Sequence, residues 1–337
     1  MENNGNEKLY RDWILEWLED KKNYVKESTY ASYANIVYNH LIPKIGNYKL
    51  KEINNHVIQK YILSLYKNGR VDSGGGLSQK TVRDIITIIK LSLRKALKDK
   101  LIDYIDLEFD YPTSSSNLKV KYFDKLEQRK IIIYCLESFT LKDIGILLSL
   151  QTGMRIGELC ALKWEDINFN KNIIYINKTL QRIYNKETGK TKVVVTNPKT
   201  VKANREIPID KDFAKLLKIF RNGNKNYVLT NTETSMEPRS FRKYYYKIIE
   251  NTKISKISFH SLRHTYASNC IRLGVDYKTV SELLGHASVN ITLNIYVHPQ
   301  LSEKKRCANL LFKENSDLFL NAYKKNKDVE IKSDIIS

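Results

Sequence analysis

Residues 152–159 read TGMRIGEL, and they join the end of one apolar run to the start of the next. Gly153 permits a tight turn into a helix, and we expect Arg155 in the first turn of that helix. The helix dipole opposes a cation at this end, so Arg155 needs an anionic partner. A bound phosphate meets that need, and so does a salt bridge. Glu158 lies on the same face and would hold the guanidinium or a nearby imidazole.

Further along the chain, short segments carry side chains that suit phosphate chemistry. Lys199, in TNPKT, connects two predicted strands, where it would approach a phosphate or protonate a leaving oxygen. His260 and Arg263, in HSLRHT, share a helix face and would present an imidazole and a guanidinium to one phosphate. His286, in LGH, follows a glycine that suits a helix C-cap. Tyr296, in NIYVH, ends a short helix soon afterwards.

Each of these residues also has a plain structural interpretation. Lys199 is a surface lysine in a lysine-rich chain, and His260 and His286 are core or helix-capping histidines. A metal site at His260 and His264 fits the i, i+4 spacing but lacks the glutamate of zinc protease helices, so we expect no metal. His264 is expected to point away from His260 and to pack. Among 22 tyrosines, Tyr296 is favoured by its place after the Gly-His turn.

The first third of the chain predicts a compact helical bundle. Helical spacing of apolar residues recurs over residues 9–18, 50–66 and 78–97. Ser78 is the expected N-cap of the last of these helices, whose apolar face runs to Leu97. Another helix is expected to begin at Ser28 or Thr29 and to be stopped by Pro43.

The second half predicts a mixed domain. Expected helices span 124–135, 141–151, 155–162, 211–220, 240–249, 259–273, 277–284, 289–296 and 303–323. Expected strands span 173–176, 193–196 and 205–209, with a hairpin tip at 186–190 between the first two. The predicted fold class is mainly α with a small antiparallel β-sheet.

A composition shift sets the predicted domain boundaries. Residues 113–119, which follow Pro112 and contain the serine run 114–116, have the composition of a linker. The expected division is therefore a helical domain over 1–112, the linker, an α+β domain over 120–300, and a C-terminal helix and tail over 301–337.

Charge and cysteine usage limit the class of partner. A formal net charge of +20 favours a polyanion, and nucleic acid is preferred to a membrane surface because the basic residues are spread along the chain. AT-rich codons, which favour lysine, account for part of the excess. The 4 cysteines are far apart, which argues against a zinc site or a disulfide framework. With no signal peptide or membrane span in the sequence, we expect a cytoplasmic protein associated with the nucleoid.

The segments TGMRIGEL, HSLRHT, LGH and NIYVH, in this order, resemble the catalytic boxes of the tyrosine recombinases, the phage integrase family. The resemblance covers residues of about 120–300 well, and the helical domain resembles the family's core-binding domain in pattern and position. It implies a site-specific DNA recombinase that needs neither metal nor another cofactor.

The same resemblance implies a role for each candidate residue. Arg155 and Arg263 would clamp the scissile phosphate, and Tyr296 would attack it to form a 3′-phosphotyrosyl link. Lys199 would protonate the leaving 5′ oxygen. His260 would take the tyrosine proton, and His286 would hydrogen-bond the phosphate. Glu158 would hold the catalytic side chains in place without touching the phosphate itself.

Partners follow from the same resemblance. The substrate would be double-stranded DNA carrying recombination sites, and four active sites around two duplexes imply a tetramer on DNA. The amphipathic helix over 303–323, with Leu310, Leu311, Leu318 and Leu320, would dock on a neighbouring protomer or cover its own domain. An excisionase or a DNA-bending protein would be an accessory.

Several functions within and near the family stay open. The hairpin over 183–194 and the basic loop over 199–205 favour the integrase of a mobile element over a chromosome-dimer resolvase of the Xer type. The bundle begins almost at once, so an arm-site binding domain is either absent or removed. A type IB topoisomerase and a catalytically silent DNA-binding protein are further alternatives. The target sequence, the crossover spacing and the oligomeric state without DNA are not encoded in any recognisable pattern.

Overall fold

The structure is a computed structural model. It describes residues 8–72, 74–103, 106–112, 120–185, 190–196 and 203–296, together with single positions and short pieces between 305 and 320. At 184–185 and 294–296 it describes the backbone but not the side chains.

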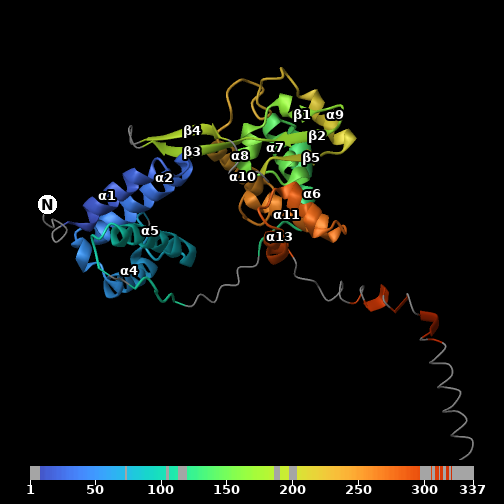
Figure 1. The fold of residues 1–337 in the computed structure, drawn as a ribbon. Coiled ribbons are helices and arrows are strands. Elements are labelled where there is room, and N and C mark those ends of the chain that lie inside the picture. The colour runs from blue at the N-terminus through green and yellow to red at the C-terminus, as the bar shows by residue number, and fades with distance from the viewer. Residues whose placement is uncertain are drawn as a thin grey trace, which may run out of the picture.

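The N-terminal part is a bundle of helices around its own core (Figure 1). In chain order these are α1 (Tyr10–Lys21), α2 (Glu27–Ile36), a π-helical turn (Val37–Leu41), α3 (Ile42–Ile45), a 3-10 turn (Leu50–Glu52), α4 (Asn55–Asn68) and α5 (Gln79–Lys98). The Ser78 hydroxyl accepts a hydrogen bond from the Thr81 amide at 3.2 Å, which confirms the predicted N-cap. Leu97, predicted to face the core, is instead 38% exposed, and Ala96 is buried in its place.

The prediction for the second helix was wrong at both ends. Helix α2 begins at Glu27 after Lys26, without a side-chain cap from Ser28 or Thr29. Pro43 does not end the helical segment, because the π-helical turn places this residue in the first turn of α3, where its missing N–H is tolerated. The Tyr61 hydroxyl donates to the His40 carbonyl at 2.7 Å and gives that carbonyl a side-chain partner.

Residues 106–112 run back along the bundle before the gap in the described chain. The Gln59 amide group exchanges hydrogen bonds of 3.0 and 3.1 Å with the backbone of Asp110. The Arg83 guanidinium lies 5.2 Å from the ring centre of Tyr111. The expected linker at 113–119 lies outside the described residues.

The C-terminal part consists, in the described residues, of helices and two small sheets. Its helices are α6 (Lys125–Ser138), α7 (Leu141–Thr152), α8 (Ile156–Ala161), a 3-10 turn (Trp164–Asp166), α9 (Lys211–Ile219), α10 (Pro238–Asn251), α11 (His260–Arg272), α12 (Tyr277–Leu284) and α13 (Val289–Tyr296). Its strands are β1 (Ile167–Asn168), β2 (Ile173–Ile176), β3 (Thr179–Asn185), β4 (Lys190–Thr196) and β5 (Arg205–Pro208). The mainly α prediction with a small antiparallel sheet is confirmed.

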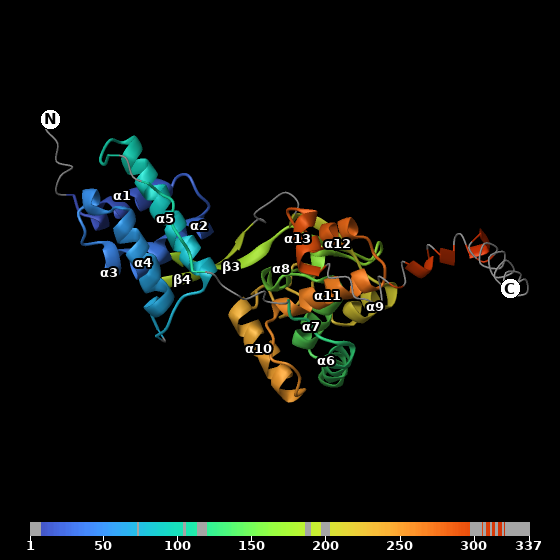
Figure 2. The same ribbon diagram turned by 90° about the horizontal axis from the view of Figure 1, so that it is seen from below.

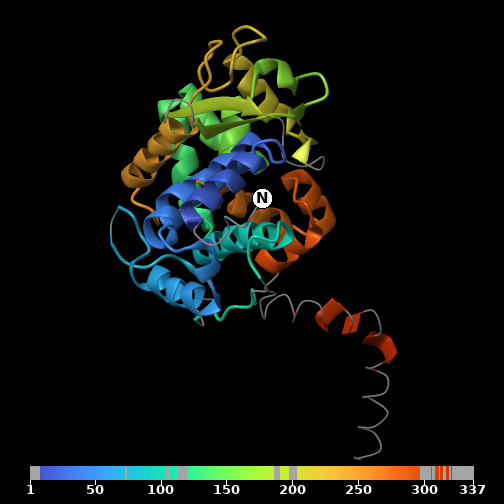
Figure 3. The same cartoon turned by 60° about the vertical axis from the view of Figure 1, so that its left-hand side comes forward.

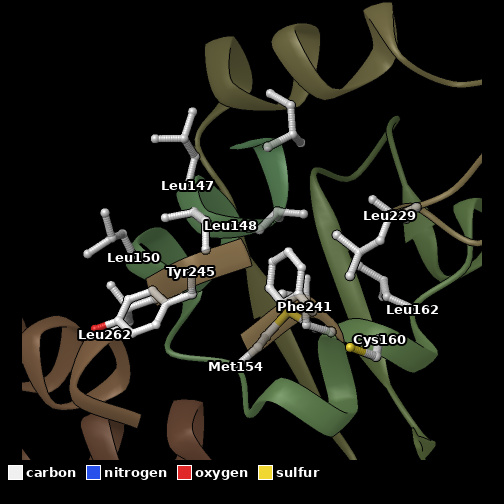
Figure 4. Packing of buried hydrophobic residues seen from close by; sticks show 14 of the residues in the cluster. Leu147, Leu148, Leu150, Met154, Cys160, Leu162, Leu229, Phe241, Tyr245 and Leu262 are labelled. Atoms are coloured by element: carbon white, nitrogen blue, oxygen red, sulfur yellow. The ribbon is translucent and has the colours of Figure 1, made fainter. Parts of the chain in front are cut away.

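A second hydrophobic core holds this part together. Leu148, Phe241 and Tyr245 are fully buried where α7 meets α10, and Leu262 of α11 joins them (Figure 4). The Tyr245 hydroxyl donates to the Ile257 carbonyl at 2.9 Å, so this tyrosine is a packing residue.

Strand pairing differs from the prediction. Strands β1, β2 and β5 form one antiparallel sheet, with Ile174 opposite Ile207, while β3 and β4 pair only with each other. The predicted pairing of 173–176 with 193–196 was therefore wrong, because β3 intervenes and is the partner of β4, whereas the hairpin predicted over 183–194 is confirmed by the pairing of Ile183 with Lys192. Strands β4 and β5 belong to different sheets, and residues 197–202, which include Lys199, lie outside the described part.

The β3–β4 hairpin reaches from the C-terminal part to the N-terminal bundle. Helix α2 lies beside β3, and Glu27 pairs with Lys192 at 2.9 Å (Figures 1 and 2). A rotated view shows α2 beneath the hairpin from another side (Figure 3). Within the described residues, no helix has both the length and the apolar content needed to cross a membrane.

Candidate active site

The candidate site is assembled around the C-terminal end of α12. This helix contacts α11, α13 and β5, and α11 also contacts α7, the helix that leads into Arg155. Segments that lie far apart in the sequence therefore meet at one place. Each contributes one of the predicted side chains or a group that holds one.

Gly153 makes the close approach of these elements possible. It caps α7 in the left-handed region, with φ of 64°. A Cβ atom at this position would lie 2.6 Å from the Tyr266 ring and 2.8 Å from Leu284. Glycine is thus required both by the backbone conformation and by the space.

Arg155 occupies the N-cap of α8 rather than its first turn. Its backbone N–H donates to Glu158 Oε2 at 2.9 Å, and its guanidinium donates to Glu158 Oε1 at 2.7 Å. The second guanidinium nitrogen donates to the Gly285 carbonyl at 3.1 Å. The anionic partner that the sequence required is therefore Glu158 in this structure, and 37% of the Arg155 side chain stays exposed.

Glu158 holds a second arginine that sequence reasoning missed. Its carboxylate accepts hydrogen bonds from Arg205 at 3.1 and 2.8 Å, and both side chains are only 5% exposed. Burial alone would raise the pKa of Glu158, but the hydrogen bonds and charges of Arg205 and Arg155 outweigh it and lower that pKa to about 2. Glu158 is therefore ionised throughout the physiological range.

Arg263 is buried behind the exposed end of α11. It is 2% exposed, and it donates to the Gly153 carbonyl at 2.9 Å and to the Leu284 carbonyl at 2.6 Å. These contacts join α11 to the end of α7 and the end of α12. A guanidinium held on two sides in this way has a fixed orientation.

His260 and His264 lie closer together than predicted. Their rings meet edge to face with centroids 4.7 Å apart, because residues at i and i+4 share a helix face. The prediction that His264 points away was therefore wrong. Desolvation and the charges of Arg263 and Arg155 lower the pKa of His260, and desolvation with His260 lowers that of His264 to about 4. No group of three or more His, Cys, Asp or Glu side chains suited to a metal occurs in the described part of the chain.

His286 follows the predicted glycine cap. Gly285 adopts φ of 63°, and the His286 backbone N–H donates to the Ser281 carbonyl at 3.0 Å. Its Nδ1 lies 2.9 Å from the Thr292 hydroxyl, a partner that the sequence did not indicate. Burial and the surrounding arginines lower the pKa of His286 to about 3, so its ring is neutral near pH 7.

Tyr296 is the last residue of α13, which packs on α11 and α12. The backbone is described here, but the side chain is not. Lys199 lies outside the described residues altogether. The structure thus brings together Arg155, Glu158, His260, Arg263 and His286, and it places the backbone of Tyr296 at the end of a neighbouring helix.

Cations and neutral imidazoles gathered at one helix end define a site suited to a phosphate group, and hence the class of enzymes that act on phosphoesters. Comparison with known proteins gives the particular family. The model described as phage integrase family matches residues 121–303, and the phage integrase N-terminal SAM-like domain matches residues 9–66. The chain therefore belongs to the phage integrase family, and it is a site-specific tyrosine recombinase, a DNA strand-transferring enzyme.

Two curated relatives share sequence with much of the chain. A "Tyrosine recombinase XerC-like" protein of Caldanaerobacter subterraneus subsp. tengcongensis is 28% identical, over 93% of this chain and 83% of its own length. The ICEBs1 integrase of Bacillus subtilis is 25% identical, over 70% of this chain and 66% of its own length.

Solved structures share the fold. The Tn1549 transposon integrase in complex with a circular intermediate DNA aligns with a TM-score of 0.73 at 17% identity, covering 90% of this chain and 99% of that one. The lambda integrase tetramer bound to a Holliday junction aligns with a TM-score of 0.61 at 17% identity, covering 89% and 82%.

Proposed function

We propose that this recombinase is the integrase of a mobile element, which cuts and rejoins double-stranded DNA through a 3′-phosphotyrosyl intermediate. The observation that carries the proposal is the convergence of Arg155, Arg263, His260 and His286 beside the helix that ends at Tyr296. The relative from ICEBs1 and the fold shared with the Tn1549 integrase support the mobile-element assignment.

The proposed reaction begins with attack by the Tyr296 hydroxyl on the scissile phosphorus. Arg155 and Arg263 would neutralise the two non-bridging oxygens, whose charge grows in the transition state. His260 would accept the tyrosine proton, since its lowered pKa keeps the ring neutral and able to take one. The P–O bond to the 5′ oxygen breaks as the phosphotyrosine bond forms.

Two further residues would act on the oxygens of the phosphate. Lys199 would donate a proton to the departing 5′ oxygen and leave a free hydroxyl. The neutral His286 would donate a hydrogen bond to a non-bridging oxygen from Nε2, with Nδ1 oriented by Thr292. Attack by the 5′-hydroxyl of another strand then reverses each step, so the energy of the broken bond is retained.

The first test is covalent trapping on DNA. Wild type and Tyr296→Phe would be incubated with a nicked duplex carrying the element's end sequence, and adducts would be separated on denaturing gels. We expect an adduct in the wild type alone, joined to Tyr296. Binding without an adduct in the wild type would favour a silent DNA-binding protein, and an adduct in both would assign the nucleophile to another tyrosine.

The assembly on DNA is also proposed to be a tetramer, with helical domain 1–112, linker 113–119, catalytic domain 120–300 and C-terminal helix 301–337 as its parts. Each exchange breaks strands of two duplexes, and the solved lambda integrase tetramer has the same fold. Leu310, Phe312, Leu318 and Leu320 are exposed in the described pieces near the C-terminus, while Leu311 lies outside them. We expect the segment to dock on a neighbouring protomer.

A truncation after Val297 tests this docking. The shortened chain should still bind a single site but lose tetramer formation and recombination, measured by native gels and by product analysis. Normal assembly and recombination by the truncated chain would show that the segment covers its own domain instead. An excisionase or a DNA-bending protein is the expected accessory for excision.

The Xer-type resolvase is the second candidate function, favoured by the XerC-like relative, which matches most of the chain. A plasmid assay distinguishes the two functions. An integrase would join its element's end to a different target sequence, whereas a resolvase would recombine only two copies of one chromosomal site. The enzyme is expected to act at the nucleoid in either case.

A further inference from the structure

Three consecutive carbonyls at the end of α12 each accept a hydrogen bond from a different arginine. Arg205 Nε donates to Leu283 at 2.6 Å, Arg263 donates to Leu284 at 2.6 Å, and Arg155 donates to Gly285 at 3.1 Å. Carbonyls at a helix C-terminus lack partners within the helix and carry partial negative charge. The turn that leads to His286 is thus held by three cations.

Arg205 differs from Arg155 in its exposure, because 37% of the Arg155 side chain is exposed. It is the first residue of β5, and its side chain is 5% exposed. Its guanidinium makes four hydrogen bonds within the protein: two to Glu158, one to Leu283 and one of 3.2 Å to Ala203. Because all three of its guanidinium nitrogens are bonded to protein acceptors, Arg205 is not placed to touch a DNA phosphate itself.

The bonds of Arg205 run to two parts of the proposed site. Arg205 and Arg155 both donate to the Glu158 carboxylate. Arg205 therefore fixes the carboxylate that orients the Arg155 guanidinium. Through Leu283 it fixes the turn that carries His286. The planar guanidinium carries donors on two edges, so it can bind the Glu158 carboxylate with two parallel hydrogen bonds and the Leu283 carbonyl with a third. A lysine ammonium cannot reproduce the two parallel bonds to the carboxylate.

We propose that Arg205 is a positioning residue, which sets the Arg155 guanidinium and the His286 turn for strand cleavage without contacting DNA. This inference rests on the proposed roles of Arg155 and His286. A residue with a purely structural role would affect only the stability of the folded protein. A positioning residue also affects the rate of cleavage once DNA is bound.

The test compares Arg205→Lys with wild type on the nicked duplex at saturating protein. We expect the rate of adduct formation to fall about 10- to 100-fold, as for a lost stabilising contact in a pre-organised site, while the DNA dissociation constant changes less than about twofold. Arg182→Lys is the matched control, because Arg182 also pairs with a glutamate, Glu237, but lies on β3 away from the turn. It should cleave at the wild-type rate.

Two measurements separate positioning from a structural effect. The cleavage rate of the double variant Glu158→Gln/Arg205→Gln should fall by less than the combined losses of Glu158→Gln and Arg205→Gln, because each single change already breaks the Glu158–Arg205 pair. The double variant also leaves neither a buried carboxylate nor a buried guanidinium unpaired, so it keeps the test valid if Arg205→Lys folds poorly. Additive losses in the double variant would overturn the proposal.

A substrate with a methyl group in place of one non-bridging oxygen at the scissile phosphate gives the second measurement. This substrate lacks the charge that Arg155 would neutralise. The ratio of the adduct-formation rates of wild type and Arg205→Lys should therefore shrink at least about tenfold. The inference would be overturned if this ratio of rates were the same on both substrates, or if Arg205→Lys cleaved normal DNA at the wild-type rate. Absence of an adduct with wild type would instead count against the proposed function.

Discussion

At the scale of single residues, the site depends on one buried carboxylate. Glu158 joins two arginines that come from different elements, and it caps its own helix through the Arg155 amide. The sequence identified Glu158 and Arg155 by their spacing in TGMRIGEL. It did not identify Arg205, because an arginine at the start of a strand in a chain with 57 lysines and arginines has no distinguishing pattern.

Replacing Glu158 by glutamine should lower the free energy of unfolding by about 3 kcal/mol at pH 7, because it leaves Arg205 buried without its counter-ion. Urea unfolding of the two proteins measures this difference. Glu165→Gln is the control, because Glu165 is 45% exposed and its lysine partners are 3.9 and 4.0 Å away. The control should lose less than about 1 kcal/mol.

The same pair of proteins should show a defined pH dependence. The folded-state pKa of Glu158 is about 2, below its ordinary value of 4.5. Its contribution to stability is therefore complete above pH 4.5 and is lost as the pH falls from there towards 2. The stability difference between wild type and Glu158→Gln should stay constant from pH 7 to 5 and shrink below 4.5. A difference that shrank between pH 7 and 5 would contradict this assignment.

At the scale of helices and strands, caps were easier to predict than partners. Ser78, Gly153 and Gly285 act locally, and their positions in the sequence were sufficient to place them. The partner of a strand depends on distant residues, so β3 was missed and β2 was paired wrongly. Pro43 was misjudged for a related reason: the π-helical turn that accommodates it has no pattern of its own.

Ser78→Ala should lower the free energy of unfolding by about 1 kcal/mol, because the Thr81 amide at the start of α5 loses its acceptor. Thermal unfolding of the full chain is the measurement. Ser28→Ala makes the same chemical change within α2, where Ser28 is not the cap, and should leave the melting temperature nearly unchanged. Equal losses in both variants would show that the Ser78 contact has no capping role.

Gly153→Ala should be more harmful than the same change at Gly74. Both glycines have positive φ, of 64° and 66°, so both variants carry a backbone cost of about 1 kcal/mol. Only at Gly153 would the new methyl group collide with Tyr266 and Leu284, since nothing lies within 4 Å at Gly74. We expect a further loss of about 1–3 kcal/mol and slow cleavage for Gly153→Ala. Comparable melting temperatures for both variants would refute the clash.

At the scale of the whole molecule, charge and fold point to DNA by separate routes. The net charge of +20 indicated a polyanion without any knowledge of the fold. The catalytic boxes predicted the family, and the match over residues 121–303 confirmed it. The relative contributions of the two domains to DNA binding were beyond the reach of the sequence, because lysine is abundant throughout.

DNA binding should weaken steeply with salt. If binding neutralises six to ten phosphates, affinity should fall about 10³- to 10⁵-fold between 50 and 200 mM salt, through release of condensed counter-ions. Fluorescence anisotropy with a labelled duplex measures the slope, and a random duplex of equal length is the comparison. A slope near zero would mean that the basic residues do not lie against the backbone of the DNA.

Three arginines donate hydrogen bonds to the successive carbonyls of residues 283–285, and these bonds restrict where residues can be inserted or deleted. An inserted or deleted residue there would move every one of these peptide groups by one position, and all three side chains would lose their partners together. At Gly74 and Gly75 an added Cβ would meet nothing within 4 Å, so an extra residue there puts at risk the backbone hydrogen bond from Arg70 to Gly75 but no packed side chain. A tag or a reporter peptide for following this enzyme in cells therefore belongs in that loop of the helical bundle.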